Sequence, residues 1–551
     1  MCGIAGILSK NGENVAPIVG MMLSRMARRG PDGAGMAADD ALVRADSVQM
    51  LAAAGVRGSC VLGHARLAIV GGSIGSQPFR SCDGRLVLEH NGEIYNYKQL
   101  RAKLEAKSKH TFQTMTDSEV IVHLLEDYLA QGLGLEAAIK KAVPRLDGIY
   151  ALAVKDNATG QVALVRDPLG VRPLYWAENG RFVAFASERK GLWEAGVPEP
   201  TRRVLPGHAL MVSPAAGAVS QVRVAPLLSP NKKNRRPSSI STMRDAVAAY
   251  EKALMASMKK RTQDVERIGI IFSGGIDSVL VAHIAKMMVP EVACYTAGVK
   301  GSSDLDHARA VADSLGLRLY AHELEQDEIE GLVPRIIKVI EDSNAGQVEV
   351  ALPVYCAVRL ASSHGMRIML TGQGADELFG GYSWYPHIAR RYGYGRLRAH
   401  MLDDLMLLYK ETLEREDKIT MAHSVELREP FLDRGVIRTA MDMDLRLNVR
   451  KEDMFGKRVH RNLACRLGVP KEIAYRVKEA AQHGSGVHSA IDAIARKNGF
   501  DEDAVTAGYL RILESKEKVG SSQRYGYLFE KEKKMWIAEP HVQMYLDSLI
   551  K

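Results

Sequence analysis

Hydrophobic and polar positions follow different patterns in the two halves of the chain. Up to about residue 228, short apolar stretches alternate with turns, which predicts paired β-sheets with few helices. The stretches are CGIAGIL (2–8), CVLGHARLAIV (60–70), RLVLEHNG (85–92), GIYALAVKD (148–156), QVALVRD (161–167) and RFVAFASE (181–188). The segment 116–133 has a helical period instead, with Thr116 expected as N-cap and Glu119 three residues later.

The second half alternates strand-like and helix-like segments. The expected strands are RIGIIF (267–272), EVACYTAGV (291–299), LRLYAHEL (317–324) and MRIMLTG (366–372). Stretches such as DSVLVAHIAKMM and DHARAVADSLG separate them and have a helical pattern. This alternation predicts a parallel sheet with helices on its faces. From about residue 385 onward the pattern is mostly helical and charged.

A polar segment separates the halves. SPNKKNRRPSSIST begins at residue 229 and holds two prolines, four serines and the densest basic run of the chain. No aromatic residues interleave with that run, so we expect a solvated linker and no nucleic-acid partner. The predicted domains are therefore 1–228 and 241–551, joined by a linker at 229–240.

Composition narrows the class of protein. The chain has 551 residues and a formal net charge of +9, a weak indication of anionic ligands such as nucleotides. Its six cysteines are scattered without a CxxC pair, which argues against a zinc site and a disulfide framework and fits a reducing cytoplasm. No apolar run reaches about 18 residues and no basic region precedes the first one, so we expect neither a membrane span nor a signal peptide.

The first eight residues, MCGIAGIL, place a cysteine directly after the initiator methionine. One interpretation is a small apolar residue that begins a strand. The other is an N-terminal nucleophile: once Met1 is removed, Cys2 carries a thiol together with an α-amine. The pKa of such an amine is roughly 7.7–8.0, which suits a general base. This stretch alone leaves both open.

Two glycine turns follow strands of the second half. In IGIIFSGGIDSVLVAHIAKMM, backbone amides and a helix N-terminus can hold phosphate, and Asp277 can hold a magnesium ion. The loop is not a Walker loop. MLTGQGADELFGGY (369–382) repeats the pattern and offers Asp376 as a second carboxylate for the same ion. Ligands of open parallel sheets lie at the carboxyl ends of the strands, so both turns can face one crevice. An ordinary strand-to-helix turn and a helix-capping acid remain the alternatives.

Several motifs together resemble one family. MCGIAGI, RRGPD (28–32), GHARLAI (63–69), NGEIYNY (91–97), TDSE (116–119), RDPLGVRPLY (166–175) and FASE (185–188) are similar to class II glutamine amidotransferases. SGGIDS, LTGQGADELFGGY, MAHSVELREPFLD (421–433) and RVKEAAQ (476–482) resemble the synthetase half of glutamine-hydrolysing asparagine synthetases. The resemblance implies an αββα sandwich of the N-terminal nucleophile type, followed by a parallel-sheet α/β ATP-pyrophosphatase domain with a helical C-terminal extension.

The resemblance also implies roles in the first domain. Cys2 would attack the side-chain amide of glutamine, and Asn91 with the Gly92 amide would form the oxyanion hole. Arg66 would hold the α-carboxylate of glutamine, and Glu93 and Asp117 its ammonium. The other implied glutamine-binding residues are Leu67, Ala68, Ile69 and Val70.

In the second domain the resemblance implies attack of aspartate on the α-phosphate of ATP, which gives β-aspartyl-AMP and pyrophosphate. Ammonia then displaces AMP and yields asparagine. Lys478 matches a catalytic lysine. Asp277 and Asp376 remain the ligands expected for Mg²⁺ from their places after the strands, and Gln373 is expected to position the substrate. The implied ATP-binding residues are Phe272, Ser273, Gly274, Gly275, Asp277, Ser278, Ala297, Thr371 and Gly372.

One departure keeps alternatives open. The chain has TGQG where bacterial-type members have SGEG, so Gln373 replaces a glutamate, and glutamine carries no charge and accepts no proton. Glu377 or Glu349 is a candidate for the missing acid. The first alternative is therefore a related enzyme that adenylates and amidates a different carboxylate. Another adenylating enzyme and a non-catalytic protein that binds glutamine or nucleotide are further alternatives. Members of the family often form homodimers, and the sequence leaves the oligomeric state open.

Overall fold

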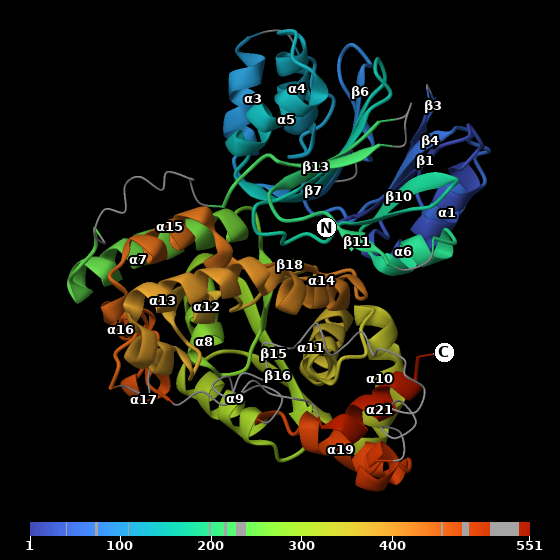
Figure 1. The fold of residues 1–551 in the computed structure, drawn as a ribbon. Coiled ribbons are helices and arrows are strands. Elements are labelled where there is room, and N and C mark those ends of the chain that lie inside the picture. The colour runs from blue at the N-terminus through green and yellow to red at the C-terminus, as the bar shows by residue number, and fades with distance from the viewer. Residues whose placement is uncertain are drawn as a thin grey trace. The chain divides into compact units, whose positions relative to one another are not determined.

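The structure is a computed structural model of the chain (Figure 1). It describes all residues except 40, 72–74, 108–109, 198–199, 214–217, 228–238, 453–455, 477–483, 507–538 and 551. Most of the predicted linker and the predicted catalytic Lys478 therefore lie outside the described residues. The described chain divides into two compact units. The first is Met1–Arg235 with Met406–Glu426, and the second is Arg236–Leu405 with Leu427–Lys551.

The first unit contains two antiparallel sheets. One has the strand order β11-β9-β10-β1-β4-β2-β3 and the other β13-β12-β8-β7-β6-β5. The strands are β1 (Gly3–Ser9), β2 (Ala34–Ala38), β3 (Ala41–Ala45), β4 (Cys60–Ala65), β5 (Phe79–Arg80), β6 (Leu86–Ile94), β7 (Gly148–Asp156), β8 (Val162–Arg166), β9 (Tyr175–Glu178), β10 (Phe182–Ala186), β11 (Arg202–Arg203), β12 (His208–Val212) and β13 (Val219–Arg223). The helices are α1 (Ala16–Arg25), α2 (Val48–Ala52), α3 (Tyr97–Glu105), α4 (Glu119–Leu129), α5 (Leu135–Ala142), α6 (Arg189–Glu194) and α14 (Glu414–Met421).

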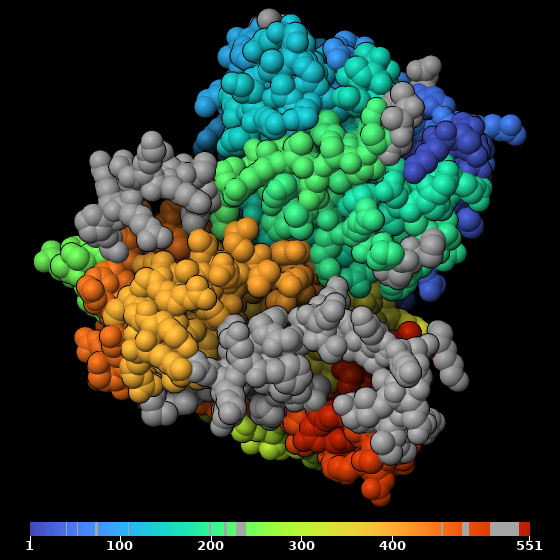
Figure 2. All heavy atoms as spheres, in the orientation of Figure 1, coloured from blue at the N-terminus to red at the C-terminus, as the bar shows by residue number. Residues whose placement is uncertain are grey.

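Three apolar clusters arrange this unit in four layers. Ile4 and Phe185 of the first sheet pack with Leu164 of the second, so the two sheets face each other. A second cluster joins α1 and α6 to the outer face of the first sheet. A third joins α3, α4 and α5 to the outer face of the second sheet, and Figure 2 shows these helices as the blue-to-cyan outer surface of the unit. The αββα sandwich that the resemblance implied is therefore confirmed.

The start of α4 differs from the sequence prediction. The helix begins at Glu119 with Ser118 as its N-cap, so the expected cap at Thr116 is wrong. Glu119 instead accepts hydrogen bonds from the amides of Gln113 (2.6 Å) and Thr114 (2.8 Å). The Glu119 carboxylate therefore points toward the preceding segment. In a capping box it would instead accept a hydrogen bond from the backbone amide of the N-cap residue.

The segment Met406–Glu426 is held in the first unit by buried ion pairs. Arg29 contacts Glu188 (2.8 Å) and Asp417 (2.7 Å), and all three side chains are almost fully buried. Glu414 accepts hydrogen bonds from Arg166 (3.1 Å) and from the hydroxyl of Tyr175 (2.6 Å). The arginines of the RRGPD and RDPLGVRPLY motifs therefore fix a segment that follows them by more than two hundred residues in the chain.

Replacement of Arg29 by alanine is expected to destabilise the first unit strongly. Glu188 and Asp417 would remain buried without their shared guanidinium, a loss that typically costs about 3–5 kcal/mol. In thermal unfolding of the full chain, this loss of stability should appear as a lower midpoint temperature of the first transition. Arg181→Ala is the matched control, because Arg181 pairs with Glu13 on the surface and its loss should change that transition little. Equal shifts for the two variants would contradict the expectation.

The second unit is built on one sheet with the order β16-β15-β14-β17-β18, and the pairings from β16 through β17 are parallel. Its strands are β14 (Arg267–Ile271), β15 (Glu291–Val299), β16 (Leu319–Leu324), β17 (Ile368–Leu370) and β18 (Glu426–Arg428). Its helices are α7 (Met243–Thr262), α8 (Ile276–Met288), α9 (Ser303–Ser314), α10 (Gln326–Ile340), α11 (Ala345–Ser363), α12 (Ala375–Phe379), α13 (Tyr385–Leu408), α15 (Arg434–Asp442), α16 (Arg458–Arg466), α17 (Lys471–Ala474), α19 (Val487–Lys497) and α21 (Pro540–Ser548).

The predicted alternation of strands and helices is confirmed here. β15 coincides with the expected stretch 291–299, and β14, β16 and β17 lie inside theirs. The short strand β18 was not expected, because its surroundings have a helical and charged pattern. None of the described helices combines the length and apolar character that a membrane span requires.

Candidate active sites

Cys2 and Asn91 are in direct contact inside the sandwich, although β1 and β6 belong to different sheets. The backbone amide of Cys2, just before β1, donates to the side-chain oxygen of Asn91 on β6 at 2.9 Å. The Cys2 sulfur lies 4.0 Å from the carbonyl oxygen of Leu67, just after β4. Three segments that are far apart in the sequence therefore converge on the thiol.

A pocket lies beside this thiol within the first unit. Eight predicted residues line it: Cys2, Arg66, Leu67, Ile69, Val70, Gly92, Glu93 and Asp117. The lining also contains seven residues that were not predicted as glutamine contacts: Met1, Gly75, Gln77, His90, Thr116, Ser118 and Glu426. Thr116 and Ser118 belong to the TDSE motif, which could have pointed to them. Glu426 belongs to the MAHSVELREPFLD motif, but that motif was assigned to the synthetase half and lies more than three hundred residues farther along the chain. Ala68 is predicted as a glutamine contact, and its amide donates to Asp32 at 2.8 Å.

The pocket holds both signs of charge. Burial raises the pKa of Asp117 to about 6, although the Ile94 amide donates to its carboxylate at 2.7 Å and acts in the opposite direction. Arg66 is buried, and a Cβ atom added at Gly75 would lie 2.7 Å from its guanidinium, so the glycine backbone packs directly against it. A ligand with a carboxylate and an ammonium group matches this pair of charges.

Gly92 occupies a position that only glycine fits. Its φ is +155°, and an added Cβ atom would lie 2.0 Å from the carbonyl oxygen of Ile149 on β7. The glycine therefore allows β6 to pair closely with β7 beside the thiol.

The protonation state of Cys2 depends on its surroundings. Burial raises the pKa of the thiol, and the nearby N-terminal ammonium acts in the opposite direction. That ammonium, on Met1, lies 3.0 Å from Glu426 Oε2. A buried thiol of this kind needs a base to become a nucleophile.

The SGG turn of the second unit lies between β14 and α8. Gly274 has a φ of +71° and is packed so tightly that an added Cβ atom would meet His307 at 2.9 Å. Ser278 binds back to the turn, because its hydroxyl donates to the carbonyl of Gly275 at 3.0 Å. Ser273 accepts from the Gly275 amide at 3.3 Å. The turn is therefore fixed by its own hydroxyl groups ahead of the helix.

The two glycine turns lie side by side, as the sequence predicted. β14 and β17 are parallel neighbours, and an added Cβ atom at Gly372 would lie 2.7 Å from the Cβ atom of Asp277. β15 and β16 lie on one side of β14, and β17 lies on its other side. Both turns therefore occur where the strand order reverses. Among the other predicted ATP contacts, Phe272 and Thr371 follow β14 and β17, and Ala297 lies on the neighbouring β15.

Asp277 and Asp376 converge on one cation, the ammonium of Lys457. Its Nζ lies 2.5 Å from Asp277 Oδ2 and 2.7 Å from Asp376 Oδ1, and it is almost fully buried. His460 lies 3.2 Å from the other oxygen of Asp277. Two converging carboxylates provide the hard oxygen ligands that Mg²⁺ prefers, so the donor set fits the predicted ion. Lys457 and His460 were not predicted from the sequence, because nothing in their local pattern points to the strand ends.

Glu377 and Glu349, the two candidates for the acid that Gln373 cannot supply, have different surroundings. Glu377 is buried on α12 and accepts a hydrogen bond from the Tyr382 hydroxyl at 2.5 Å. Glu349 is fully buried on α11, 3.2 Å from His488, and burial raises its pKa to about 7. Gln373 lies in the turn between β17 and α12, two residues before the helix.

Comparison with known proteins places both units in established families. Residues 1–205 match the glutamine amidotransferase domain family. Residues 249–407 and 389–546 match the asparagine synthase family.

Similarity to individual proteins extends over nearly the whole chain. "Putative asparagine synthetase (glutamine-hydrolyzing) 1" of Methanocaldococcus jannaschii is 33% identical over 94% of this chain and 99% of its own length. "Asparagine synthetase (glutamine-hydrolyzing) 2" of Oryza sativa subsp. japonica is 31% identical over 96% of this chain and 85% of its own. The chain, with its amidotransferase sandwich and its parallel synthetase sheet, belongs to the glutamine-hydrolysing asparagine synthetase family.

Proposed function

We propose that this protein is an enzyme that makes asparagine from aspartate, with ATP as energy source and glutamine as nitrogen source. Two sites in one chain support the proposal: a thiol pocket with charges for an amino acid, and a glycine-turn edge with two carboxylates. The family membership and the similarity over nearly the full length of named asparagine synthetases support the same reaction.

In the first unit, Met1 is removed and the Cys2 sulfur attacks the side-chain carbonyl carbon of glutamine. The carbon–sulfur bond forms, the carbon–nitrogen bond breaks, and ammonia leaves with a proton that the α-amine of Cys2 delivers. Water then cleaves the thioester and releases glutamate. Asn91 and the Gly92 amide stabilise the oxyanion in both steps, a contribution typically worth about 3–4 kcal/mol per donor.

In the second unit, the SGG turn and the Gly372 turn bind ATP at the carboxyl ends of β14 and β17. Asp277 and Asp376 would hold Mg²⁺, and the ion would supply positive charge that neutralises the phosphates. For the ion to bind between them, Lys457 must leave its present position or share the carboxylates. The β-carboxylate of aspartate attacks the α-phosphorus of ATP and releases pyrophosphate. Ammonia attacks the resulting acyl carbon, and AMP leaves with its bond electrons.

A product assay tests the proposal. Purified protein with ATP, Mg²⁺, aspartate and glutamine should form asparagine, AMP and pyrophosphate in equal amounts, and intact mass should show the loss of Met1. Glutamate release without asparagine or pyrophosphate would contradict aspartate as the acceptor. It would favour the related reaction on a different carboxylate, for which Gln373 in place of glutamate is the motivating observation.

The acid required for the adenylate step can be found by substitution. If Glu377 or Glu349 replaces the missing glutamate, its change to glutamine should lower pyrophosphate formation and leave glutaminase activity unchanged. Full pyrophosphate formation in both variants would mean that Gln373 suffices for positioning alone.

Binding of glutamine should weaken as pH falls through about 6. Asp117 must be ionised to hold the ammonium of glutamine, and burial raises its pKa to about 6. Between roughly pH 8 and pH 6 the KM for glutamine should be nearly constant, and below pH 6 it should rise about tenfold per pH unit. Asp117→Asn should give a high, pH-independent KM, whereas Glu136→Gln on the surface of α5 should follow the wild type. A flat wild-type profile would exclude Asp117 from ammonium binding.

A further inference from the structure

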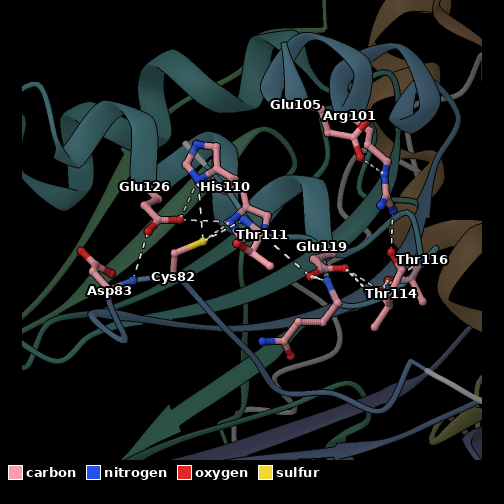
Figure 3. A network of polar contacts seen from close by, with 12 residues as sticks. Cys82, Asp83, Arg101, Glu105, His110, Thr111, Thr114, Thr116, Glu119 and Glu126 are labelled. Atoms are coloured by element: carbon pink, nitrogen blue, oxygen red, sulfur yellow. Dashed lines mark hydrogen bonds and ion pairs between the residues drawn. The ribbon is translucent and has the colours of Figure 1, made fainter. Parts of the chain in front are cut away.

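Four metal-ligating side chains converge on the outer side of the first unit, away from the residues assigned above. Cys82 lies in the turn between β5 and β6, one histidine precedes α4, and a histidine and a glutamate occupy successive turns of α4. The members, called the CHHE cluster below, are Cys82, His110, His123 and Glu126. Figure 3 shows Cys82, His110 and Glu126 turned toward one another.

The ligand atoms of the CHHE cluster lie at the spacing of a tetrahedral site. The Cys82 sulfur is 3.7 Å from His123 Nδ1 and 3.9 Å from His110 Nδ1. Glu126 Oε2 is 3.0 Å from His123 Nδ1 and 3.1 Å from His110 Nδ1. Tetrahedral zinc with ordinary bond lengths requires sulfur–nitrogen separations of about 3.6 Å and nitrogen–oxygen separations of about 3.4 Å. Each observed distance is within a few tenths of an ångström of these values, and all four atoms lie within 4.8 Å of one another.

The surroundings of the cluster match those of ligands held for a metal. His110 Nε2 lies 3.0 Å from Asp127 Oδ1, and His123 Nε2 lies 3.7 Å from Glu119 Oε1. Metal-binding histidines typically direct their second nitrogen at a carboxylate, which fixes the ring and the tautomer. The Thr111 amide also donates to the Cys82 sulfur at 3.4 Å, as backbone amides do to a thiolate.

The donor set selects the ion. One thiolate and two imidazoles are too soft for Mg²⁺ or Ca²⁺, which prefer oxygen, and a compact tetrahedron of sulfur, nitrogen and oxygen is typical of zinc. His123 and Glu126 are three residues apart on one helix and so share a face. Cys82 is exposed, whereas both histidine side chains are buried, so an ion can enter from solvent and reach its nitrogen ligands.

We propose that the CHHE cluster binds one Zn²⁺ ion. The ion joins the turn before β6, the chain before α4 and α4 itself. This is a structural site, because four protein ligands complete the tetrahedron and leave no open position for a substrate. The absence of CxxC spacing, which argued against zinc in the sequence, does not apply, because three separate segments supply the ligands.

Metal content of the purified full chain tests the site. We expect about one zinc ion per chain in the wild type and in the matched control Cys60→Ser, and a loss of most of it in Cys82→Ser and His123→Gln. Cys60 is a half-buried cysteine on β4 of the same unit. Zinc content that is negligible in the wild type after dialysis against zinc, or equal in all four proteins, would overturn the proposal.

Two further measurements do not depend on how the variants fold. Cobalt titration of the chelator-treated wild type should produce a thiolate-to-cobalt charge-transfer band and the visible bands of tetrahedral coordination. Zinc should also protect Cys82 from a thiol reagent. A cobalt spectrum without the thiolate band, or unchanged thiol reactivity with zinc, would exclude Cys82 as a ligand.

A variant beside the cluster separates ligands from their neighbours. Asp127→Asn should keep the cobalt spectrum and weaken metal affinity about 10–100-fold, because Asp127 contacts His110 but is not a ligand.

A positional effect on the glutamine pocket follows, and this step alone rests on the proposed function. Asp117 and Ser118 immediately precede α4, and Gly92 and Glu93 lie on β6, so the ion fixes both elements that carry pocket residues. Removal of zinc should raise the KM for glutamine several-fold with kcat nearly unchanged. If zinc is demonstrably bound and its removal leaves the KM for glutamine unchanged, this consequence is excluded, and the metal site itself is unaffected. Inactive protein that still binds zinc would instead contradict the proposed function.

Discussion

Cys2→Ala should abolish glutamine-dependent asparagine formation while ammonium-dependent formation continues. The sulfur atom is the only group of this residue that can form the thioester, so glutaminase activity should fall at least about 1,000-fold. Alanine is also small, so removal of Met1 should proceed as in the wild type. Glutamate release and asparagine formation, each measured with glutamine and then with ammonium chloride, separate the two activities.

The control for this variant is Cys60→Ser, which changes a cysteine of the same unit outside the pocket. It should retain both activities. Residual glutaminase of Cys2→Ala above a few percent would show that another group attacks glutamine. Loss of the ammonium-dependent reaction as well would mean that Cys2 also supports the synthetase unit, which the proposed division of chemistry does not allow.

Asp376→Asn should have the opposite effect: glutaminase is retained and pyrophosphate formation is lost. The change removes one of the two carboxylates that converge at the ends of β14 and β17. A metal ion on phosphate contributes several kcal/mol to transition-state stabilisation, so the rate should fall at least about 100-fold. The Mg²⁺ concentration for half-maximal rate should rise in parallel.

The matched control is Asp313→Asn, because Asp313 is an exposed aspartate on α9 of the same unit. It should behave as the wild type. A slower Asp376→Asn enzyme with unchanged Mg²⁺ dependence would mean that Asp376 serves only to hold Lys457. Melting curves of the three proteins would separate that role from simple unfolding, since loss of the ion pair with buried Lys457 should then appear as lower stability.

The sequence alone determined the order of elements and the chemistry of each motif. Apolar stretches predicted the long central strands of both units, because backbone pairing and burial act on consecutive residues. They are β1, β4, β6, β7, β8, β10 and β14 to β17, whereas the remaining strands, such as β2, β9 and β18, were not predicted. β15 coincides with its predicted stretch, and the turn at Ser273–Gly275 lies where the strand-to-helix pattern placed it. The resemblance supplied Cys2, Asn91 and Asp117; in the structure Cys2 and Asp117 line one pocket, and Asn91 contacts the amide of Cys2.

Helix starts were less predictable. Thr116 and Glu119 have capping-box spacing, yet Glu119 binds the amides of residues 113 and 114 and the helix begins at Glu119 itself. Local spacing cannot show this, because a carboxylate takes whichever free amides the surrounding chain presents.

Only the tertiary structure decided which distant residues share a site. Lys457 lies 180 residues from Asp277, and Glu426 lies 425 residues from Met1, yet each pair is in direct contact. The CHHE cluster likewise draws its ligands from a turn, a loop and a helix, so no spacing in the sequence reveals it. A motif records which groups are available, but convergence depends on sheet order and on the packing of helices against the sheets. These in turn are set by burial summed over the whole unit.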